Sequence, residues 1–124
     1  MEITLQVPFP PSVNHYWRWG PRGPLISRAG RDYRQSVGLC IWQGIDRGKH
    51  PFPFRGRLHV TVRLYMPDRR RRDIDNASKA LLDALTKAGV WVDDEQIDLL
   101  TISRGDVVKG GRCCVTVREI GEEA

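Results

Sequence analysis

Apolar and polar residues alternate along two short stretches of the chain. The alternation is visible at residues 3–7 and is clearest at residues 58–66, just before a proline. A period of two is typical of a β-strand that buries one face. Two further strands are expected at residues 97–103 and 112–120, joined by a turn that contains two glycines.

Two other stretches repeat their apolar residues at three- and four-residue steps, which predicts helices with one buried face. The first covers residues 31–47, and its apolar face contains Tyr33, Val37, Cys40, Ile41 and Ile45. The second begins with Asp73 as its N-cap and ends at Gly89. Its apolar stripe contains Ile74, Ala77, Leu81, Leu85 and Ala88, and its other side contains Asp75, Lys79, Asp83 and Thr86.

Residues 12–30 mix aromatic and basic side chains with glycines and prolines, and we expect a loop here. The aromatic residues Tyr16, Trp17 and Trp19 stand among Arg18, Arg22 and Arg28. This composition is typical of surfaces that contact sugar, phosphate and unstacked bases. The alternative is an ordinary loop that its aromatic residues hold against the core.

The expected order of elements is strand, helix, strand, helix, strand, strand. Helices that alternate with strands before a final hairpin favour an α/β (mixed α+β) fold, with a mixed four-stranded sheet and two helices on one side. The 124 residues suffice for one hydrophobic core, so we expect a single small domain over residues 1–124.

The net charge of +5 and the pI near 9.5 suit a polyanionic partner. The charge is also unevenly distributed, because residues 55–72 contain seven arginines and one acid whereas residues 93–98 contain four acids and no base. No apolar run has the length of a membrane span or of a secretory signal, so we expect a cytoplasmic protein without membrane contact.

The three cysteines and three histidines lack the spacing of a zinc site or a disulfide framework. We interpret Cys40, Cys113 and Cys114 as small core or half-buried residues. A metal bound by this chain would therefore have oxygen ligands, which favours magnesium or manganese. The sequence suggests no organic cofactor.

The densest charge pattern lies between residues 68 and 95. Four consecutive arginines, Arg69, Arg70, Arg71 and Arg72, precede two carboxylates, Asp73 and Asp75, at the start of the second helix. Lys79 is one turn further on the face of Asp75, and Asp93, Asp94 and Glu95 follow the helix. We expect one of these later acids to return to the start of the helix. Three oxygen ligands and a lysine would suit metal-assisted hydrolysis of a phosphodiester, with the arginines on the DNA backbone.

Each of these features also has an ordinary interpretation. The two aspartates resemble a helix cap with a solvated neighbour, the arginines a solvated loop, and the acids 93–95 a turn. Asp75 and Lys79 alone would be a surface pair. Their order within one strand, loop, helix and turn favours the functional interpretation.

The run MPDRRRRDIDNASKALLDALTKAGVWVDDEQI closely resembles the corresponding segment of the RusA-type Holliday-junction resolvases. The similarity includes the arginine run, the DxDN motif that ends in Asn76, the lysine four residues after the second aspartate, and the final pair of aspartates. The segments PFPPSVNHYWR and VVKGGRCCVTVREIGE are also similar to the family, so the resemblance covers nearly the whole chain.

This resemblance implies a homodimeric endodeoxyribonuclease that binds branched DNA and makes paired nicks in four-way (Holliday) junctions with Mg²⁺, for which Mn²⁺ is a possible substitute. It implies catalytic carboxylates at Asp73, Asp75 and Asp94, all three as metal ligands, and a catalytic lysine at Lys79. Asp93 and Asn76 are secondary candidates. The residues that match the family's DNA-contacting loop are Arg69, Arg70, Arg71 and Arg72.

A homodimer is also expected from the substrate, since symmetric cuts in a two-fold junction are made most simply by a two-fold dimer. We expect its interface at an edge strand or on the arginine-poor face of the sheet. Two alternatives remain open. One is a non-catalytic module that binds branched DNA, and the other is a nuclease that acts mainly on flaps or replication forks.

Overall fold

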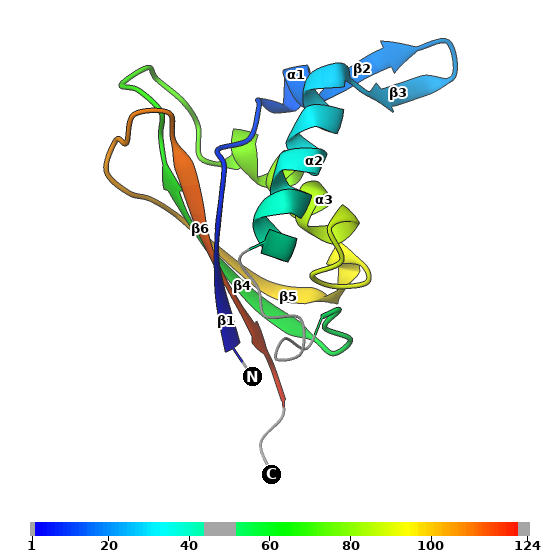
Figure 1. Ribbon diagram of the computed structural model, residues 1–124, viewed down its shortest axis with the longest axis vertical. Helices are drawn as coiled ribbons and strands as arrows, with labels where there is room; N and C mark the ends of the chain where they lie inside the picture. The colour runs from blue at the N-terminus through cyan, green and yellow to red at the C-terminus, as the bar shows by residue number, and fades with distance from the viewer. Residues whose placement is uncertain (1, 44–51, 122–124) are drawn as a thin grey trace.

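The computed structural model describes residues 2–43 and 52–121 (Figure 1). Its elements follow one another in the order β1 (Glu2–Val7), α1 (Val13–Tyr16), β2 (Trp17–Gly20), β3 (Gly23–Ile26), α2 (Arg28–Gln43), β4 (Leu58–Tyr65), α3 (Asp75–Lys87), the 3-10 helix η1 (Asp94–Gln96), β5 (Ile97–Arg104) and β6 (Arg112–Glu119). The four predicted strands are therefore present, and both predicted helices are present with shifted boundaries.

Four strands form one mixed sheet in the spatial order β1, β6, β4, β5. β6 is antiparallel to β1 and β4, whereas β4 and β5 are parallel. Leu58 at the start of β4 pairs with Ile97 at the start of β5. Because α3 connects these parallel strands, the chain must return along the sheet before β5 begins. The expected mixed four-stranded sheet is confirmed. The predicted final hairpin is wrong, because β5 and β6 pair with opposite edges of β4 and not with each other.

Helices α2 and α3 cover one face of this sheet (Figure 1). The core between the layers contains Leu5, Val7, Leu58, Val60, Val62, Leu64, Cys113, Val115 and Val117 from the strands, and Tyr33, Val37, Ile41, Ala77, Ala80, Leu81, Ala84 and Leu85 from the helices. The opposite face is polar, with hydrogen bonds such as the 3.1 Å contact between the Thr4 and Thr116 hydroxyls. The structure is thus an α+β domain with its main helices on one side.

Residues 12–30 do not form the expected loop, because they contain α1, the hairpin β2–β3 and the start of α2. Gly20 pairs with Gly23, which leaves Pro21 and Arg22 as a two-residue turn. Gly23 has a φ of +116°, a conformation that glycine adopts without the strain of a side chain. The glycines and prolines that suggested a loop are therefore the turn of a hairpin (Figure 1).

Helix α2 begins three residues earlier than predicted, at Arg28. A glycine allows it to lie close to α1, since a Cβ atom at Gly30 would be only 2.4 Å from the carbonyl oxygen of Tyr16. Cys40 lies at the edge of the buried face and is exposed, so its prediction as a buried residue was wrong. Residues 44–47, which were predicted to continue this helix, lie outside the described residues.

Helix α3 begins at Asp75, and its N-cap is Ile74 without a side-chain hydrogen bond. The prediction that Asp73 caps this helix was therefore wrong. The C-terminal end agrees with the sequence, because Ala88 is the C-cap and Gly89 follows with a φ of +87°. Within residues 2–43 and 52–121, no helix combines the length and the apolar character needed to cross a membrane.

Candidate active site

The loop between β4 and α3 carries the arginine run and is organised around Asp68. One carboxylate oxygen of Asp68 accepts hydrogen bonds from the backbone N–H of Arg70 at 3.0 Å and from Nη1 of Arg72 at 2.5 Å. The hydrogen bond from Arg72, followed by that from Arg70, lowers the pKa of Asp68 to about 2. At the end of β5, Arg104 also donates to the Arg72 carbonyl oxygen at 2.6 Å. Arg72 is therefore bound within the protein.

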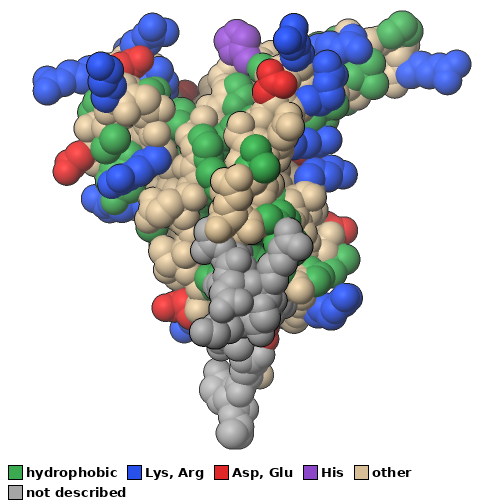
Figure 2. All heavy atoms as spheres, in the orientation of Figure 1, with side chains coloured by type: hydrophobic (Ala, Val, Ile, Leu, Met, Phe, Trp, Pro, Cys, Tyr) green, Lys and Arg blue, Asp and Glu red, His purple; other side chains and the backbone are tan. Residues whose placement is uncertain are grey.

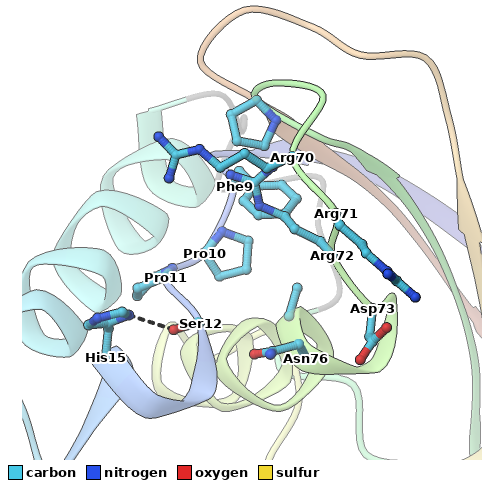
Figure 3. Close-up of a pocket in the computed structure, with 12 residues that line it drawn as sticks. Phe9, Pro10, Pro11, Ser12, His15, Arg70, Arg71, Arg72, Asp73 and Asn76 are labelled. Carbon is cyan, nitrogen blue, oxygen red and sulfur yellow. Dashed lines mark hydrogen bonds between the residues drawn. The ribbon is translucent and has the colours of Figure 1, made fainter.

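The other three arginines of the run, Arg69, Arg70 and Arg71, are exposed. Arg70 keeps a 3.6 Å contact to Asp68, although 82% of its side chain is exposed. Figure 3 shows the side chains of Arg70 and Arg71 extending to opposite sides of the loop. The run thus divides into one arginine that supports the loop and three that are accessible to a ligand.

A cavity of about 700 Å³ lies beside this loop (Figure 3). It is lined by Phe9, Pro10, Pro11, Ser12, His15, Pro67, Arg70, Arg71, Arg72, Asp73, Asn76 and Ala77. Phe9 and the prolines supply apolar walls, and the arginines supply positive charge. A planar guanidinium matches the geometry of a phosphate group, so this combination suits a phosphate-containing ligand.

Asp73 and Asp75 are both exposed at the amino end of α3. This end of a helix favours negative charge, because its backbone N–H groups and its dipole are positive there. The neighbouring Asn76 has a different role, since its Oδ1 accepts a hydrogen bond from the Val13 N–H at 3.0 Å. Asn76 therefore attaches α1 to α3 and holds one wall of the cavity.

Lys79 follows one helical turn after Asp75 and is exposed. It does not line the first cavity. It lines a second cavity of about 560 Å³, together with Val13, Asn14, Trp17, Trp19 and Pro24. The start of α3 thus has a cavity with arginines on one side and a cavity with aromatic residues on the other.

Asp93 and Asp94 lie in the turn that leads into β5. Asp93 caps η1, because its carboxylate accepts from the Glu95 N–H at 3.0 Å and its own N–H donates to Gln96 Oε1 at 2.9 Å. Asp94 is exposed, yet partial burial and a hydrogen bond with Asp93 raise the pKa of its carboxyl group. Asp93 has a local structural role that Asp94 does not share.

The structure does not bring Asp94 to the other two candidate carboxylates within one chain. Asp94 precedes the start of β5, which pairs with the start of β4, whereas Asp73 follows the end of β4. The two ends of β4 are separated by roughly 23 Å, at about 3.3 Å per residue. Among the described residues, no three His, Cys, Asp or Glu side chains lie close enough together to hold a metal ion.

The contacts of Asp83 could not be read from the helical pattern, which placed this residue on the side of α3 opposite the apolar stripe. Its Oδ2 accepts hydrogen bonds from the Tyr16 hydroxyl and from Nε of Arg34, the latter at 2.9 Å. Arg34 Nη2 also lies 2.8 Å from the same oxygen. Burial and the hydrogen bond to Asp83 raise the pKa of Tyr16. This cluster joins α1, α2 and α3 behind the candidate site.

Comparisons with known proteins identify the family of this chain. The family model "Endodeoxyribonuclease RusA" matches residues 8–118. The chain belongs to the RusA family. It is 38% identical to the crossover junction endodeoxyribonuclease RusA of Escherichia coli (strain K12) over 120 residues, which cover 97% of both chains. It is 41% identical to the protein of the same name from Enterobacteria phage 82, over 98% of this chain and 96% of the relative.

Membership of the RusA family confirms the family and the enzyme class that the sequence predicted. The matched region contains the arginine run, the three candidate carboxylates and Lys79. It also contains the hairpin β2–β3, which sequence analysis had interpreted as a loop.

Proposed function

We propose that this RusA family member resolves Holliday junctions by paired, symmetric nicks during DNA recombination and repair, as a homodimer that uses Mg²⁺ or Mn²⁺. Family membership over nearly the whole chain is the observation that carries this proposal. Its curated relatives are named crossover junction endodeoxyribonucleases. The basic cavity beside exposed carboxylates supports it independently.

In this proposal Asp73 and Asp75 bind the metal ion and the arginine loop binds the DNA. Both carboxylates are exposed at the amino end of α3, and hard divalent cations prefer such oxygen ligands. A bound Mg²⁺ would lower the pKa of a water molecule and offset the charge of the transition state. Lys79, one turn along the same helix, would hold the phosphate or the leaving oxygen.

Asp94 is the proposed third ligand, in preference to Asp93, whose carboxylate is used to cap η1. Since Asp94 lies at the opposite end of β4 from Asp73, a single chain does not supply all three ligands at one point. A second copy of the chain can supply the missing one. The site would then be formed in trans, with Asp94 from one protomer and Asp73 and Asp75 from the other.

Strand β5 offers a surface for such a dimer. It is the outermost strand of the sheet beside β4, and Leu99 and Leu100 are 50% and 38% exposed on it. Exposed edge strands pair readily with another chain, and a two-fold axis would make the two β5 strands antiparallel. The start of one β5, next to Asp94, would then meet the end of the partner's β5. At that end Arg104 contacts Arg72, the neighbour of Asp73.

A synthetic four-way junction with a mobile core tests the proposed function. With Mg²⁺, the wild-type protein should cut two opposing strands at symmetric positions, and Asp75→Asn should bind the junction without cutting it. The matched control is Asp32→Asn, which removes an exposed charge from α2 and should cut normally.

The alternatives give different results in the same experiment. A non-catalytic branched-DNA-binding module would leave the junction intact with wild-type protein and Mg²⁺. A flap or fork nuclease would cut those structures faster than the four-way junction in a panel of branched DNAs. Normal cutting by Asp75→Asn would remove this carboxylate from the proposed metal site.

A further inference from the structure

The hairpin β2–β3 extends away from the sheet and helices (Figure 1). A large aromatic side chain, Trp19, is exposed near its turn. Trp19 is 82% exposed. On the same arm of the molecule, Figure 2 shows hydrophobic side chains next to Lys and Arg side chains. A single exposed apolar residue is common on protein surfaces, so Trp19 needs a second observation before it suggests a ligand.

That observation is the cavity of about 560 Å³ between the hairpin and α3. Trp17, Trp19, Pro24 and Val13 form its apolar walls, and Asn14 and Lys79 are its polar residues. Small-molecule sites are typically clefts of roughly 300–1,000 Å³ with mostly apolar and aromatic walls and a few polar groups. The cavity has the size and lining expected for a flat aromatic group.

The hairpin is firmly attached at its base. The Ser27 N–H donates to the Tyr16 carbonyl oxygen at 3.0 Å, and the Ser27 hydroxyl donates to the same oxygen at 2.8 Å. The ring of Trp17 meets that of Tyr16 edge-on at 5.0 Å, and Arg34 lies 5.9 Å from the centre of the Trp17 ring. Trp17, which lines the cavity, is held in this way, so this part of its wall binds a flat ligand with little loss of conformational entropy.

The charge around the cavity suits a ligand that carries phosphate. Lys79 is the charged residue in its lining, and Arg18 and Arg22 lie on the hairpin that forms its aromatic wall. Lys79 lies four residues after Asp75, so it faces the same side of α3 as a proposed metal ligand. A ligand in this cavity would therefore lie next to the proposed position of the scissile phosphate.

We propose that this cavity binds an unstacked nucleobase at the branch point of the DNA substrate, with the base stacked on the indole of Trp19. The inference rests on the proposed function, because a branched DNA supplies both the base and the phosphates. Bases in a regular duplex are paired and stacked, whereas those beside a crossover are more easily released. Every base has a π-face, so stacking on Trp19 selects DNA structure without selecting sequence.

Three variants test this proposal in binding assays with EDTA, where no cleavage occurs. Trp19→Ala should weaken binding to a four-way junction by roughly 5- to 100-fold, the range expected for one stacked base, and leave duplex binding unchanged. Trp19→Phe should retain most of the affinity because it keeps an aromatic face. Leu25→Ala, on the opposite face of the same hairpin, is the matched control and should bind like the wild type. Circular dichroism establishes that each variant is folded.

A double-mutant cycle identifies the partner as a base. Each nucleotide next to the crossover is replaced in turn by an abasic site, and both proteins are measured on every junction. At the stacked position, wild-type binding should fall to the level of Trp19→Ala, and the variant should lose nothing further. The proposal would be overturned if, at every position, the abasic site and Trp19→Ala lowered the affinity independently of each other. It would also be overturned if Trp19→Ala and the wild type bound the intact junction equally well.

The same samples separate this inference from the proposed function. If the wild-type protein with Mg²⁺ cuts the junction while the cycle shows no coupling, the base-binding site is wrong and the nuclease assignment stands. If the wild-type protein does not cut any branched DNA, the proposed function fails, whatever the result at Trp19.

Discussion

Asp68 and Arg72 form an ion pair in the loop that leads from β4 to α3, with 2.5 Å between Oδ1 and Nη1. The pair has two consequences for the candidate site. It neutralises one cation of the arginine run, and it fixes the backbone immediately before Asp73. The run of four arginines therefore contains three exposed side chains and one, Arg72, with a structural contact.

Replacing Asp68 by asparagine should strengthen DNA binding and slow cleavage. Arg72 becomes available to a phosphate, so duplex affinity should rise and the slope of log K against log salt should steepen by about one phosphate contact. Cleavage should slow because the backbone before Asp73 loses its support. Asp32→Asn changes the net charge equally on α2, and an equal steepening in this control would show that the effect is not local.

The exposed arginines of the run should contribute mainly to the affinity for DNA. Replacing Arg69 and Arg71 together by alanine should weaken binding to junction and duplex alike, and should flatten the salt dependence by about two phosphate contacts. Titrations at several salt concentrations measure both quantities. Arg55→Ala, an exposed arginine at the other end of β4, is the control. An unchanged slope in the double variant would argue against this loop as the contact to the DNA backbone.

The cluster of Asp83, Arg34 and Tyr16 should contribute to stability, because its ion pair is about three-quarters buried. Asp83→Asn leaves the Arg34 guanidinium without its charged partner, and the free energy of unfolding should fall by about 1–3 kcal/mol. Urea unfolding measures this change. Asp98→Asn breaks the more exposed ion pair with Arg57 and should have a much smaller effect. An equal loss of unfolding free energy in the two variants would mean that burial of the Asp83 cluster adds no stability.

The sequence predicted those strands and helices whose apolar residues follow one regular period. Alternation identified β1 and β4, and a stripe that includes Leu81 and Leu85 identified α3. The hairpin β2–β3 was missed because its glycines and prolines suggested a loop, although they form a two-residue turn. Asp83 was missed because a helical pattern shows which residues share a side but not that α2 packs there with Arg34.

The position of Asp94 could not be predicted without the direction of β5. Had β5 been antiparallel to β4, the turn before it would have met the end of β4, where Asp73 lies. The two strands are parallel, so the turn lies at the start of β4 instead. The family resemblance placed Asp94 in the motif as a predicted metal ligand, and it does not indicate which chain would complete each proposed site.

Mixing two inactive variants tests whether the site is formed in trans. Asp75→Asn and Asp94→Asn should each fail to cut a junction with Mg²⁺. With trans sites, a heterodimer of the two variants has one site with all native carboxylates and one that carries both substitutions. About half of the dimers in a refolded equimolar mixture are heterodimers, so about a quarter of all sites should regain activity. The product should be a single nick instead of paired cuts. With cis sites, every site carries one asparagine and the mixture stays inactive. Asp94→Asn mixed with a chain that carries both Asp75→Asn and Asp94→Asn is the control, and activity there would reveal contaminating nuclease.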